Sequence, residues 1–461
     1  MGLLDLACRR LIHPLWARRE DRRAARLRDE LARRQFDPPT VVHARQVVAL
    51  RRTLRHAAAT VPYYRDLFRR VGFRPDEVHS LDDLQALPIL TKSDIRARGR
   101  DLLSEAFRSQ PLTRKTTSGS TGVPLEVRLD AGGLSWKRAC TLRSDEWSGW
   151  RRGRPVAKVW GNPDYRKHGP KGWLRNLLYD RAIHLDTLSM TPEAIRRFVM
   201  TFNRRRPELL FGHAHSVFLL ADFINRHGWK AHRPDGIITT AMVLHDWQRR
   251  RIEATFGCPV TNRYGCEEVS LIACECERHR GLHINADSVL VEIVRNGKPA
   301  EPGTSGSIVV TDLSDFAMPL IRYLIGDVGV LAERHCECGR GSPLLESIEG
   351  READYVVTAD GRLISGISLT ENFAVLVPGV AQIQIVQDEV RRFLFRIVRG
   401  SGWSPASERK LSDLVAERFG KGVRYTLEFV DVIPQEATGK YRFCISHVQH
   451  PSVAEGGRIA A

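Results

Sequence analysis

Hydroxyl and glycine residues are interleaved in the segment Thr116-Thr117-Ser118-Gly119-Ser120-Thr121-Gly122. Glycine lets a polyphosphate come close to the backbone, and Ser and Thr hydroxyls together with backbone N–H groups donate to its oxygens. The segment lacks the GK[ST] ending of a Walker A loop. The same composition is also common in plain turns. The loop therefore indicates a phosphate site only when other residues support it.

Further motifs follow this loop along the chain, and together they support its interpretation as a phosphate site. They are Tyr264-Gly265-Cys266-Glu267-Glu268, Ile321-Arg322-Tyr323-Leu324-Ile325-Gly326-Asp327, Gly350-Arg351-Glu352-Ala353-Asp354 and Thr438-Gly439-Lys440. Here the chain resembles the adenylate-forming superfamily of acyl-CoA synthetases, adenylation domains and luciferases. Its patterns TSGSTG, YGxxE, RY…GD, GRxxD and a C-terminal GK all occur in the family order. Each motif alone is weak, but the ordered set is specific.

Within this superfamily the chain most resembles the phenylacetate-CoA ligase and CapK-like branch, which includes relatives in capsule biosynthesis and in adenylylation of a deazaflavin cofactor. The resemblance covers about residues 40–445. It rests on Val61-Pro62-Tyr63-Tyr64-Arg65, Leu87-Pro88, Thr91-Lys92, the GSTGVP form of the loop and the cysteines around His283.

The resemblance implies a role for each matching residue around ATP. The phosphates would be held by Thr117, Ser118, Gly119, Ser120, Thr121 and Gly122. Glu268 would ligate Mg²⁺, a hard cation that takes oxygen ligands and bridges phosphates. Tyr264 would stack on or border adenine, Asp327 would accept the ribose hydroxyls, and Arg351 would contact ribose or phosphate.

The resemblance also implies that Lys440 reaches the α-phosphate and the carboxylate oxygens of an acid substrate. Its charge would offset the negative charge that builds in the transition state. Attack of a carboxylate on the α-phosphorus brings two anions together, so positioning is the main task. No general base is needed, since the acid is already ionised at neutral pH.

Cysteines form a second constellation between Cys258 and Cys338. Cys276-x6-His283 and Cys336-x-Cys338 supply one imidazole and three soft thiolates, which suit a closed, structural Zn²⁺ site. The branch also carries a Cys before GLH and a CxCGR segment, which implies the same four residues. Cys274 and His279 are alternative ligands, and buried free thiols with a core histidine are the non-metal reading.

The sequence departs from the family pattern at the nucleotide and substrate positions. Thr239-Thr240-Ala241-Met242-Val243-Leu244 lacks the Glu that relatives carry ahead of Leu, and Glu267 adds a carboxylate that could compete for the metal. Trp160-Gly161-Asn162 and Phe211-Gly212-His213 lie where family substrates bind, although plain packing explains such aromatic residues equally well. The segment after residue 352 lacks the glycine-rich stretch expected for the pantetheine channel of CoA. The sequence therefore does not identify the acyl acceptor.

Between residues 110 and 350, β-rich runs alternate with helical runs, which is typical of α/β layers. Expected strands include residues 124–129, 156–160, 236–243, 288–294 and 306–313, and expected helices include 194–206, 216–228 and 246–257. Thr91 is expected to cap a helix. After residue 352 we expect a hairpin with Asp360-Gly361 at its turn, two strands, a helix and a last strand.

These observations predict an α/β fold with a large multi-layered N-terminal adenylate-forming domain and a small mobile α+β C-terminal lid domain. The expected boundaries are a helical segment 1–60, an ATP- and substrate-binding core 61–351 with an inserted zinc site, a lid 352–447 and a flexible tail 448–461. A lid of about 100 residues is an ordinary domain size.

Composition indicates a globular protein. The chain has 461 residues, 42% hydrophobic and 27% charged, and no run nears the roughly 18 apolar residues of a membrane span. Asp5, Arg9 and Arg10 interrupt what would be the apolar region of a signal peptide, and Leu6 breaks the myristoylation pattern. We therefore expect a cytoplasmic protein without a transmembrane segment.

The net charge of +17, from 71 Lys and Arg against 54 Asp and Glu, permits binding of nucleic acid or anionic lipid. Arginine-rich helices are also ordinary solvated surface. The basic amphipathic N-terminal helix either lies on a membrane or packs on its own domain, and we favour the second reading.

The resemblance implies an ATP-dependent, AMP-forming acid–thiol ligase that activates a carboxylic acid, an aromatic acid being one candidate, and transfers it to CoA. Its cofactors would be ATP, Mg²⁺, structural Zn²⁺ and CoA. The alternative is an adenylyltransferase or an acyl transferase to a cofactor, amine or sugar intermediate. A zinc-containing nucleic-acid binder is the remote alternative, and no specific nucleic acid is expected. A homodimer is compatible with the sequence.

Overall fold

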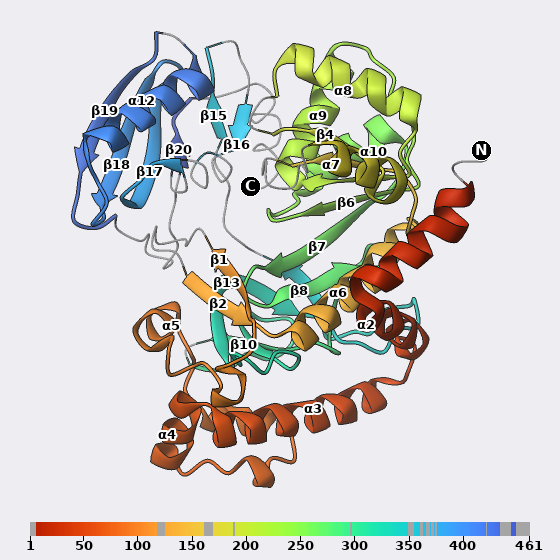
Figure 1. Cartoon of the computed structure of the whole chain (residues 1–461), viewed down its shortest axis with the longest axis vertical. Coiled ribbons are helices and arrows are strands. Elements are labelled where there is room, and N and C mark those ends of the chain that lie inside the picture. Colours follow the sequence, from red (N-terminus) through yellow and green to blue (C-terminus); the bar gives the residue numbers. More distant parts are fainter. Residues whose placement is uncertain are drawn as a thin grey trace. The chain divides into compact units, whose positions relative to one another are not determined.

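The computed structural model describes residues 6–117, 125–160, 169–187, 190–295, 297–348, 355–359, 363–365, 369, 373, 376–420, 422–433 and 444–448. Its contacts divide the chain into two units. Unit 1 comprises residues 1–117, 125–153 and 261–350, and unit 2 comprises residues 118–124, 154–260 and 351–461. Figure 1 labels many of the helices and strands of both.

Unit 1 combines helices from the N-terminal part of the chain with a large, mainly antiparallel sheet. Its helices are α2 (His13–Arg34), α3 (Pro39–Thr60), α4 (Pro62–Val71), α5 (Lys92–Arg98) and α6 (Ala131–Asp145). Its strands are β1 (Thr113–Thr117), β2 (Leu125–Leu129), β7 (Val260–Cys266), β8 (Ser270–Glu275), β9 (Leu282–Ile284), β10 (Val289–Arg295), β11 (Lys298–Pro299), β12 (Ser305–Asp312), β13 (Tyr323–Leu331) and β14 (Leu344–Ile348). β1 and β2 form a separate ribbon, and the others follow the order β11-β10-β12-β13-β14-β9-β8-β7.

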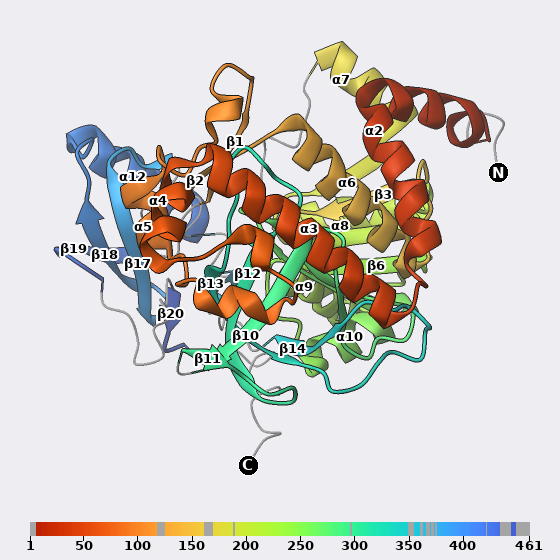
Figure 2. The same cartoon turned by 90° about the horizontal axis from the view of Figure 1, so that it is seen from below.

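Helix α3 lies along β10 and β12 of this sheet (Figure 2). Its apolar side chains Leu50 and Leu54 share a buried core with Ile293 and Ile308 of these strands. Gln46 Nε2 donates to the carbonyl oxygen of Val289 over 3.2 Å. The apolar stripe of α3 therefore covers one face of the sheet.

Helix α2 is bent at Asp21, whose backbone leaves the helical conformation. The carboxylate of Asp21 accepts hydrogen bonds from the Ala24 N–H (2.8 Å) and from Ser135 Oγ of α6 (3.1 Å). Beyond the bend, Ala24 and Leu31 share a buried cluster with two residues of α6. This part of the basic helix therefore packs on its own unit.

Helix α5 begins with the predicted cap. Thr91 Oγ1 accepts from the Asp94 N–H, and the Asp94 carboxylate accepts from the Thr91 N–H over 2.8 Å. This reciprocal pair is a capping box, which satisfies donors that the first helical turn leaves open. The expected N-cap is confirmed.

Unit 2 contains a parallel sheet followed in sequence by the C-terminal module. The first part comprises β3 (Val156–Val159), α7 (Gly169–Arg175), β4 (Ala182–Leu185), α8 (Pro192–Arg205), β5 (Leu209–His213), α9 (Ala214–Arg226), β6 (Gly236–Thr240) and α10 (Asp246–Phe256). The second comprises β15 (Tyr355–Val357), β16 (Leu363–Ser365), β17 (Val380–Glu389), β18 (Arg392–Arg399), α12 (Pro405–Phe419), β19 (Arg424–Phe429) and β20 (Cys444–Ser446). The predicted α/β fold is confirmed, and β15 pairs antiparallel with β16 as expected for the hairpin.

Two sequence expectations need comment. Strand β6 ends at Thr240 rather than at Val243, because Ala241 adopts φ +68°, a left-handed conformation that cannot continue a strand. The predicted lid boundary after Arg351, the hairpin turn at Asp360-Gly361 and the tail after residue 448 lie outside the described residues. In the described part of the chain, no helix has the length and apolar character needed to cross a bilayer.

A buried network of charged groups connects α6 with the segment after β12. Lys137 of α6 forms an ion pair with Asp312, and both side chains are almost completely buried. Asp130, at the N-terminus of α6, accepts from the Phe316 N–H, while its own N–H donates to Asp315. Ser314 Oγ donates to Asp312 over 2.7 Å. One lysine thus faces three carboxyl groups.

Burial, followed by the nearby charge of Asp312, raises the pKa of Asp315 to about 7 from an ordinary 3.8. Asp130 raises it further, whereas Lys137 opposes the shift. Because the folded-state pKa is the higher one, the stabilising contribution of this group is complete below about pH 4 and is lost as the pH rises through 7.

Because Asp315 contributes a free energy of unfolding that falls between about pH 4 and 7, we expect the slope of the total free energy of unfolding against pH over that range to be more positive in Asp315→Asn than in wild type. Urea unfolding at a series of pH values measures it. Asp413→Asn, on the exposed face of α12, is the matched control and should keep the wild-type slope. An unchanged slope in Asp315→Asn would refute the protonation of this carboxyl.

Candidate functional site

The hydroxyl-rich loop begins at the end of a β-ribbon. Thr117 is the last residue of β1 and stands opposite Leu125, the first residue of β2. Residues 118–124 between them lie outside the described part, so Ser118, Gly119, Ser120, Thr121 and Gly122 are not placed. The paired residues nevertheless fix where the loop leaves and re-enters the ribbon.

Lys115 connects this ribbon to the turn between β7 and β8. Its Nζ lies 3.2 Å from Ser270 Oγ, 3.4 Å from the Glu267 carbonyl oxygen and 3.5 Å from the Glu267 carboxylate. Glu267, the extra acidic residue noted in the sequence, is exposed and forms its ion pair here. The β1–β2 ribbon and the YGxxE motif are thereby brought to one place.

Two residues of separate motifs meet in a direct hydrogen bond. Tyr264 Oη on β7 donates to Asp327 Oδ2 on β13 over 2.9 Å. Strands β14, β9 and β8 separate β13 from β7 in the sheet order, so a flat sheet would keep the two strands about 19 Å apart at ~4.8 Å per strand. The sheet must therefore curve strongly for these side chains to touch.

A second contact joins the same two regions. Tyr323 Oη on β13 donates to Glu268 Oε1 in the β7–β8 turn over 2.8 Å, and both side chains are buried. Burial, followed by the nearby Glu268 charge, raises the pKa of Cys266 well above its usual range, so this thiol stays neutral. The Glu268 carboxylate is held by a phenol and keeps further acceptor capacity.

Arg322 has a structural task beside these residues. It adopts φ +52°, and its buried guanidinium pairs with Glu292 of β10 (3.0 Å) while donating to the backbone carbonyl of Leu87. Leu90 continues the attachment through backbone hydrogen bonds with Arg322 and Leu324, both of 2.9 Å. Arg322 thus fixes the segment before α5 against β13.

The arrangement gathers oxygen donors of the kind that a magnesium nucleotide requires. Glu268 and Asp327 present carboxylates, and each accepts a phenol hydrogen that orients it. Carboxylate oxygens are suitable ligands for Mg²⁺ and suitable acceptors for sugar hydroxyls. Arg351 and Lys440 lie outside the described residues. Sequence reasoning missed the contacts of Tyr323 and Lys115, although Tyr323 lies within a recognised motif.

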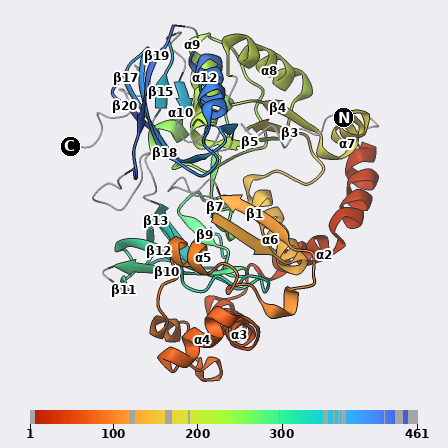
Figure 3. The same ribbon diagram turned by 60° about the vertical axis from the view of Figure 1, so that its left-hand side comes forward.

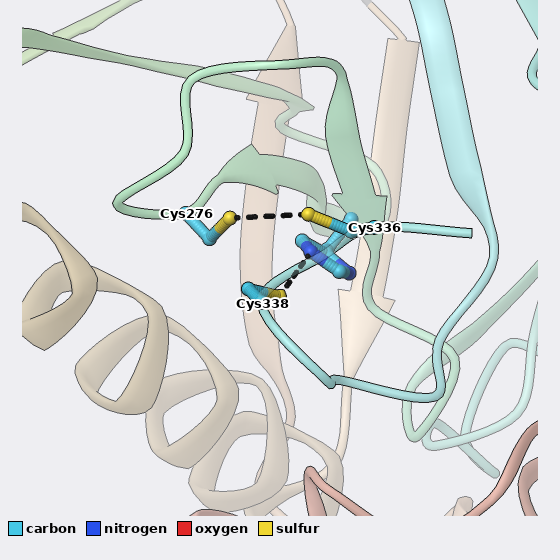
Figure 4. A group of neighbouring side chains, drawn as sticks. Cys276, Cys336 and Cys338 are labelled. Carbon is cyan, nitrogen blue, oxygen red and sulfur yellow. Dashed lines mark hydrogen bonds between the residues drawn. The ribbon is translucent and has the colours of Figure 1, made fainter. Parts of the chain in front are cut away.

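The predicted zinc ligands converge in unit 1 (Figure 4). Cys276, His283, Cys336 and Cys338 each offer a ligand atom, and these atoms all lie within 4.8 Å of one another. Cys276 Sγ and Cys336 Sγ are 3.7 Å apart, and Cys338 Sγ lies 3.2 Å from His283 Nε2. A disulfide needs about 2.05 Å between sulfurs, whereas two thiolates on one tetrahedral zinc are about 3.8 Å apart.

The protonation and orientation of His283 also fit a metal. Burial lowers its pKa to about 4, so the ring is neutral at neutral pH. Its Nδ1 lies 3.0 Å from Ser342 Oγ, which leaves Nε2 facing the thiols. Metal-binding histidines usually hold their second nitrogen in this way. Among the described residues, the four-atom group includes neither Cys274 nor His279.

Arg340 supports this cluster and connects it to the N-terminal segment. Its backbone N–H lies 3.4 Å from Cys338 Sγ, and its guanidinium binds Glu277 (2.9 Å) and Gln35 Oε1 (3.0 Å). The guanidinium also lies over the Trp147 ring, 4.6 Å from its centre. Gln35, at the end of α2, is therefore part of the shell that surrounds the thiols.

The residues expected near an acid substrate lie in unit 2. Trp160 follows β3, and Phe211 and His213 belong to β5. Their rings are in contact, with Trp160 3.9 Å from His213 and 5.4 Å from Phe211 between centroids. Gly161 and Asn162 lie outside the described residues.

Comparison with known proteins gives consistent results for sequence and fold. The CapK C-terminal domain family matches residues 356–447. Phenylacetate-coenzyme A ligase of Thermus thermophilus is 28% identical over 330 residues, covering 69% of this chain and 72% of that protein. Protein CapK of Staphylococcus aureus is 24% identical over 396 residues, covering 84% and 85%. The structure of a 2-hydroxyisobutyryl-CoA ligase superposes with TM-score 0.60 at 20% identity, covering 90% of this chain and 92% of that one.

The fold is thus the one found in an acid-CoA ligase that forms acyl-adenylates. In sequence the chain is similar to phenylacetate-CoA ligases and to CapK, and its residues 356–447 match the CapK C-terminal domain family.

Proposed function

We propose that this protein activates a carboxylic acid with ATP and transfers the acyl group to the thiol of CoA. The observation that carries the proposal is the meeting of two motifs in unit 1: the β7–β8 turn and β7 contact β13 through Glu268 and Tyr264, and Lys115 of β1 contacts the same turn. Relatives named as phenylacetate-CoA ligases support the same chemistry.

In the first half-reaction a carboxylate oxygen of the acid bonds to the α-phosphorus of ATP. The bond from that phosphorus to the bridging oxygen breaks, and pyrophosphate leaves. In the second, the CoA sulfur attacks the acyl carbon, AMP leaves, and the thiol proton is released. Residues 117–122 would hold the phosphates, Asp327 the ribose, and Tyr264 would border adenine while orienting Asp327. Arg351 would contact ribose or phosphate.

Glu268 is the proposed Mg²⁺ ligand, and the ion would neutralise charge on the phosphates. Lys440 would place its ammonium between the α-phosphate and the attacking carboxylate. Both groups act by position and charge, which suits a reaction between two anions.

The overall test is exchange of pyrophosphate into ATP with a panel of carboxylic acids, followed by mass spectrometry of products formed with CoA. Acid-dependent exchange and a thioester are the expected results. Absence of exchange with every acid, in protein that binds ATP, would refute the proposal.

A second candidate keeps the adenylation step and changes the acceptor to a cofactor, an amine or a sugar intermediate. It is favoured by the CapK family match over residues 356–447 and by the longer alignment to CapK than to the phenylacetate-CoA ligase. Acid-dependent exchange without a thioester would select this candidate.

We further propose that Cys276, His283, Cys336 and Cys338 bind a structural Zn²⁺. Four protein ligands leave no open position for substrate. The ion would join the β8–β9 connection to the segment after β13, two stretches that local sequence does not hold together.

Tyr264→Phe tests the phenol–carboxylate pair. The ring is kept while Asp327 loses its donor, so the KM for ATP should rise about tenfold or more, in keeping with ~1.5–3 kcal/mol for a hydrogen bond to a charged group. Steady-state exchange measures it. Tyr425→Phe in β19 removes a remote hydroxyl and serves as the control. An unchanged KM for ATP would disprove the role of this pair.

Lys440→Ala tests the proposed transition-state contact. Adenylation should slow by on the order of 10² to 10³, as expected for loss of one charged donor, while ATP binding largely persists. Single-turnover adenylation and equilibrium ATP binding separate the two effects. Lys410→Ala, on exposed α12, is the control. Near-wild-type adenylation in Lys440→Ala would disprove the assignment.

Elemental analysis tests the metal. Protein purified without chelator or polyhistidine tag should contain about one zinc per chain, as a closed site of four ligands requires. Cys336→Ser should lower this content and the thermal stability. Cys274→Ser removes a neighbouring thiol outside the four and should retain the zinc. Folded wild type without metal, or equal loss in both variants, would contradict the site.

A further inference from the structure

The N-terminal helix has two parts, one on each side of a bend. A π-helical turn, η1 (Cys8–Ile12), leads into α2, whose backbone leaves the helical conformation at Asp21. From Asp21 onward the helix packs on α6 through Ala24 and Leu31, and Figure 3 shows α2 and α6 side by side. Residues 8–20, before the bend, form what we call the N-terminal arm. The contacts of Asp21, Ala24 and Leu31 do not explain this arm.

The apolar side chains of the arm lie on two different sides. Cys8 is buried, Ile12 and Trp16 are half-buried, and these three residues follow each other at intervals of four. Leu11 and Leu15 are also four residues apart, but they are 62% and 64% exposed. Residues four apart share a face of a helix, and π-helical turns occur frequently at functional sites. The arm thus has an inner face and, separate from it, an open apolar face.

Basic residues accompany the open face. Residues 9–26 contain seven arginines and two acidic residues. Arg10, Arg22 and Arg26 are exposed, and none of them forms an ion pair with another described residue. Their charge is therefore available to an anionic partner outside the chain.

We propose that the N-terminal arm lies on an anionic lipid surface, with Leu11 and Leu15 inserted among the headgroups and the arginines beside the lipid phosphates. Helices that lie in a membrane interface combine bulky apolar residues on one face with many Lys or Arg residues. The arm has both features. This interaction goes beyond the proposed acid activation and does not depend on it.

The chemistry of the arm favours a lipid surface over other partners. A second copy of the arm would bring the same arginines together, and like charges oppose such a contact. A nucleic acid would attract the arginines through its phosphates but would leave the exposed leucines without an apolar partner. An anionic bilayer satisfies both groups, because its acyl chains accept the leucines and its headgroups attract the arginines.

Sedimentation of the full chain with lipid vesicles tests the proposal. Wild type should bind vesicles of phosphatidylcholine with about one third phosphatidylglycerol, and it should bind vesicles of phosphatidylcholine alone about tenfold more weakly. Raising the salt from about 0.1 M to about 0.5 M should weaken binding, because salt screens the arginines.

Leu11→Glu combined with Leu15→Glu should lower binding to the anionic vesicles about tenfold or more, because the apolar face is lost while the arginines remain. Leu11→Phe combined with Leu15→Phe should keep the wild-type binding. The matched control is Val48→Glu combined with Val71→Glu. These valines of α3 and α4 are 68% and 44% exposed, so the control adds the same two charges at apolar surface positions outside the arm. Circular dichroism verifies that each variant is folded.

Two results would overturn the inference directly: wild type that does not bind the anionic vesicles, or equal losses in the leucine and valine variants. Binding that persists in the leucine-to-glutamate variant would also overturn it, since attraction would then come from overall charge. Sedimentation velocity without vesicles examines a second copy of the chain as the partner. Self-association that the same variant abolishes, in wild type that does not bind vesicles, would make the open face an interface between copies instead.

Discussion

The curvature of the unit 1 sheet is the constraint on which the candidate nucleotide site depends. Strands β7 and β13 are separated by three others, yet Tyr264 and Asp327 share a hydrogen bond of 2.9 Å. The buried hydrogen bond between Tyr323 and Glu268 is a second contact between β13 and the turn after β7. Two phenols thus both close the curved sheet and orient the carboxylates. Residues that the sequence indicates only as ligand-binding groups therefore also stabilise the curvature of the sheet.

Much of this site could be predicted from residue types, because the motifs preserve the groups and their order. The partners of these groups could not be predicted. Glu267 and Glu268 are adjacent and chemically equal in sequence, but the turn exposes Glu267 to Lys115 and buries Glu268 beside Tyr323. That difference arises from the geometry of a turn and from a strand more than 50 residues away. Local sequence carries no information on such long-range registry.

The thiol cluster illustrates the same limit. Composition and spacing allowed either Cys274 or Cys276 as a ligand. Cys274 lies within β8, opposite His283 in the ladder, and burial raises its pKa, whereas Cys276 follows the strand and turns toward Cys336. The position of the strand end thus decides which thiol joins the group. The hydrogen bond from Arg340 to Gln35 beside the thiols could not be predicted from the sequence either. It depends on how the N-terminal helix packs against α6.

The distribution of charge explains why a basic chain need not be a nucleic-acid binder. Several arginines form ion pairs inside the fold: Arg143 pairs with Asp287 at 2.8 Å, and Arg322 pairs with Glu292 at 3.0 Å. These buried pairs fix elements far apart in sequence, and they are unavailable to a polyanion. The remaining positive excess acts over a longer range, where it favours the approach of anions without selecting among them. ATP and a carboxylic acid are both anions, so a net charge of +17 suits an enzyme that must bring them together. Selection then falls to short-range contacts such as the carboxylates that phenols hold in unit 1.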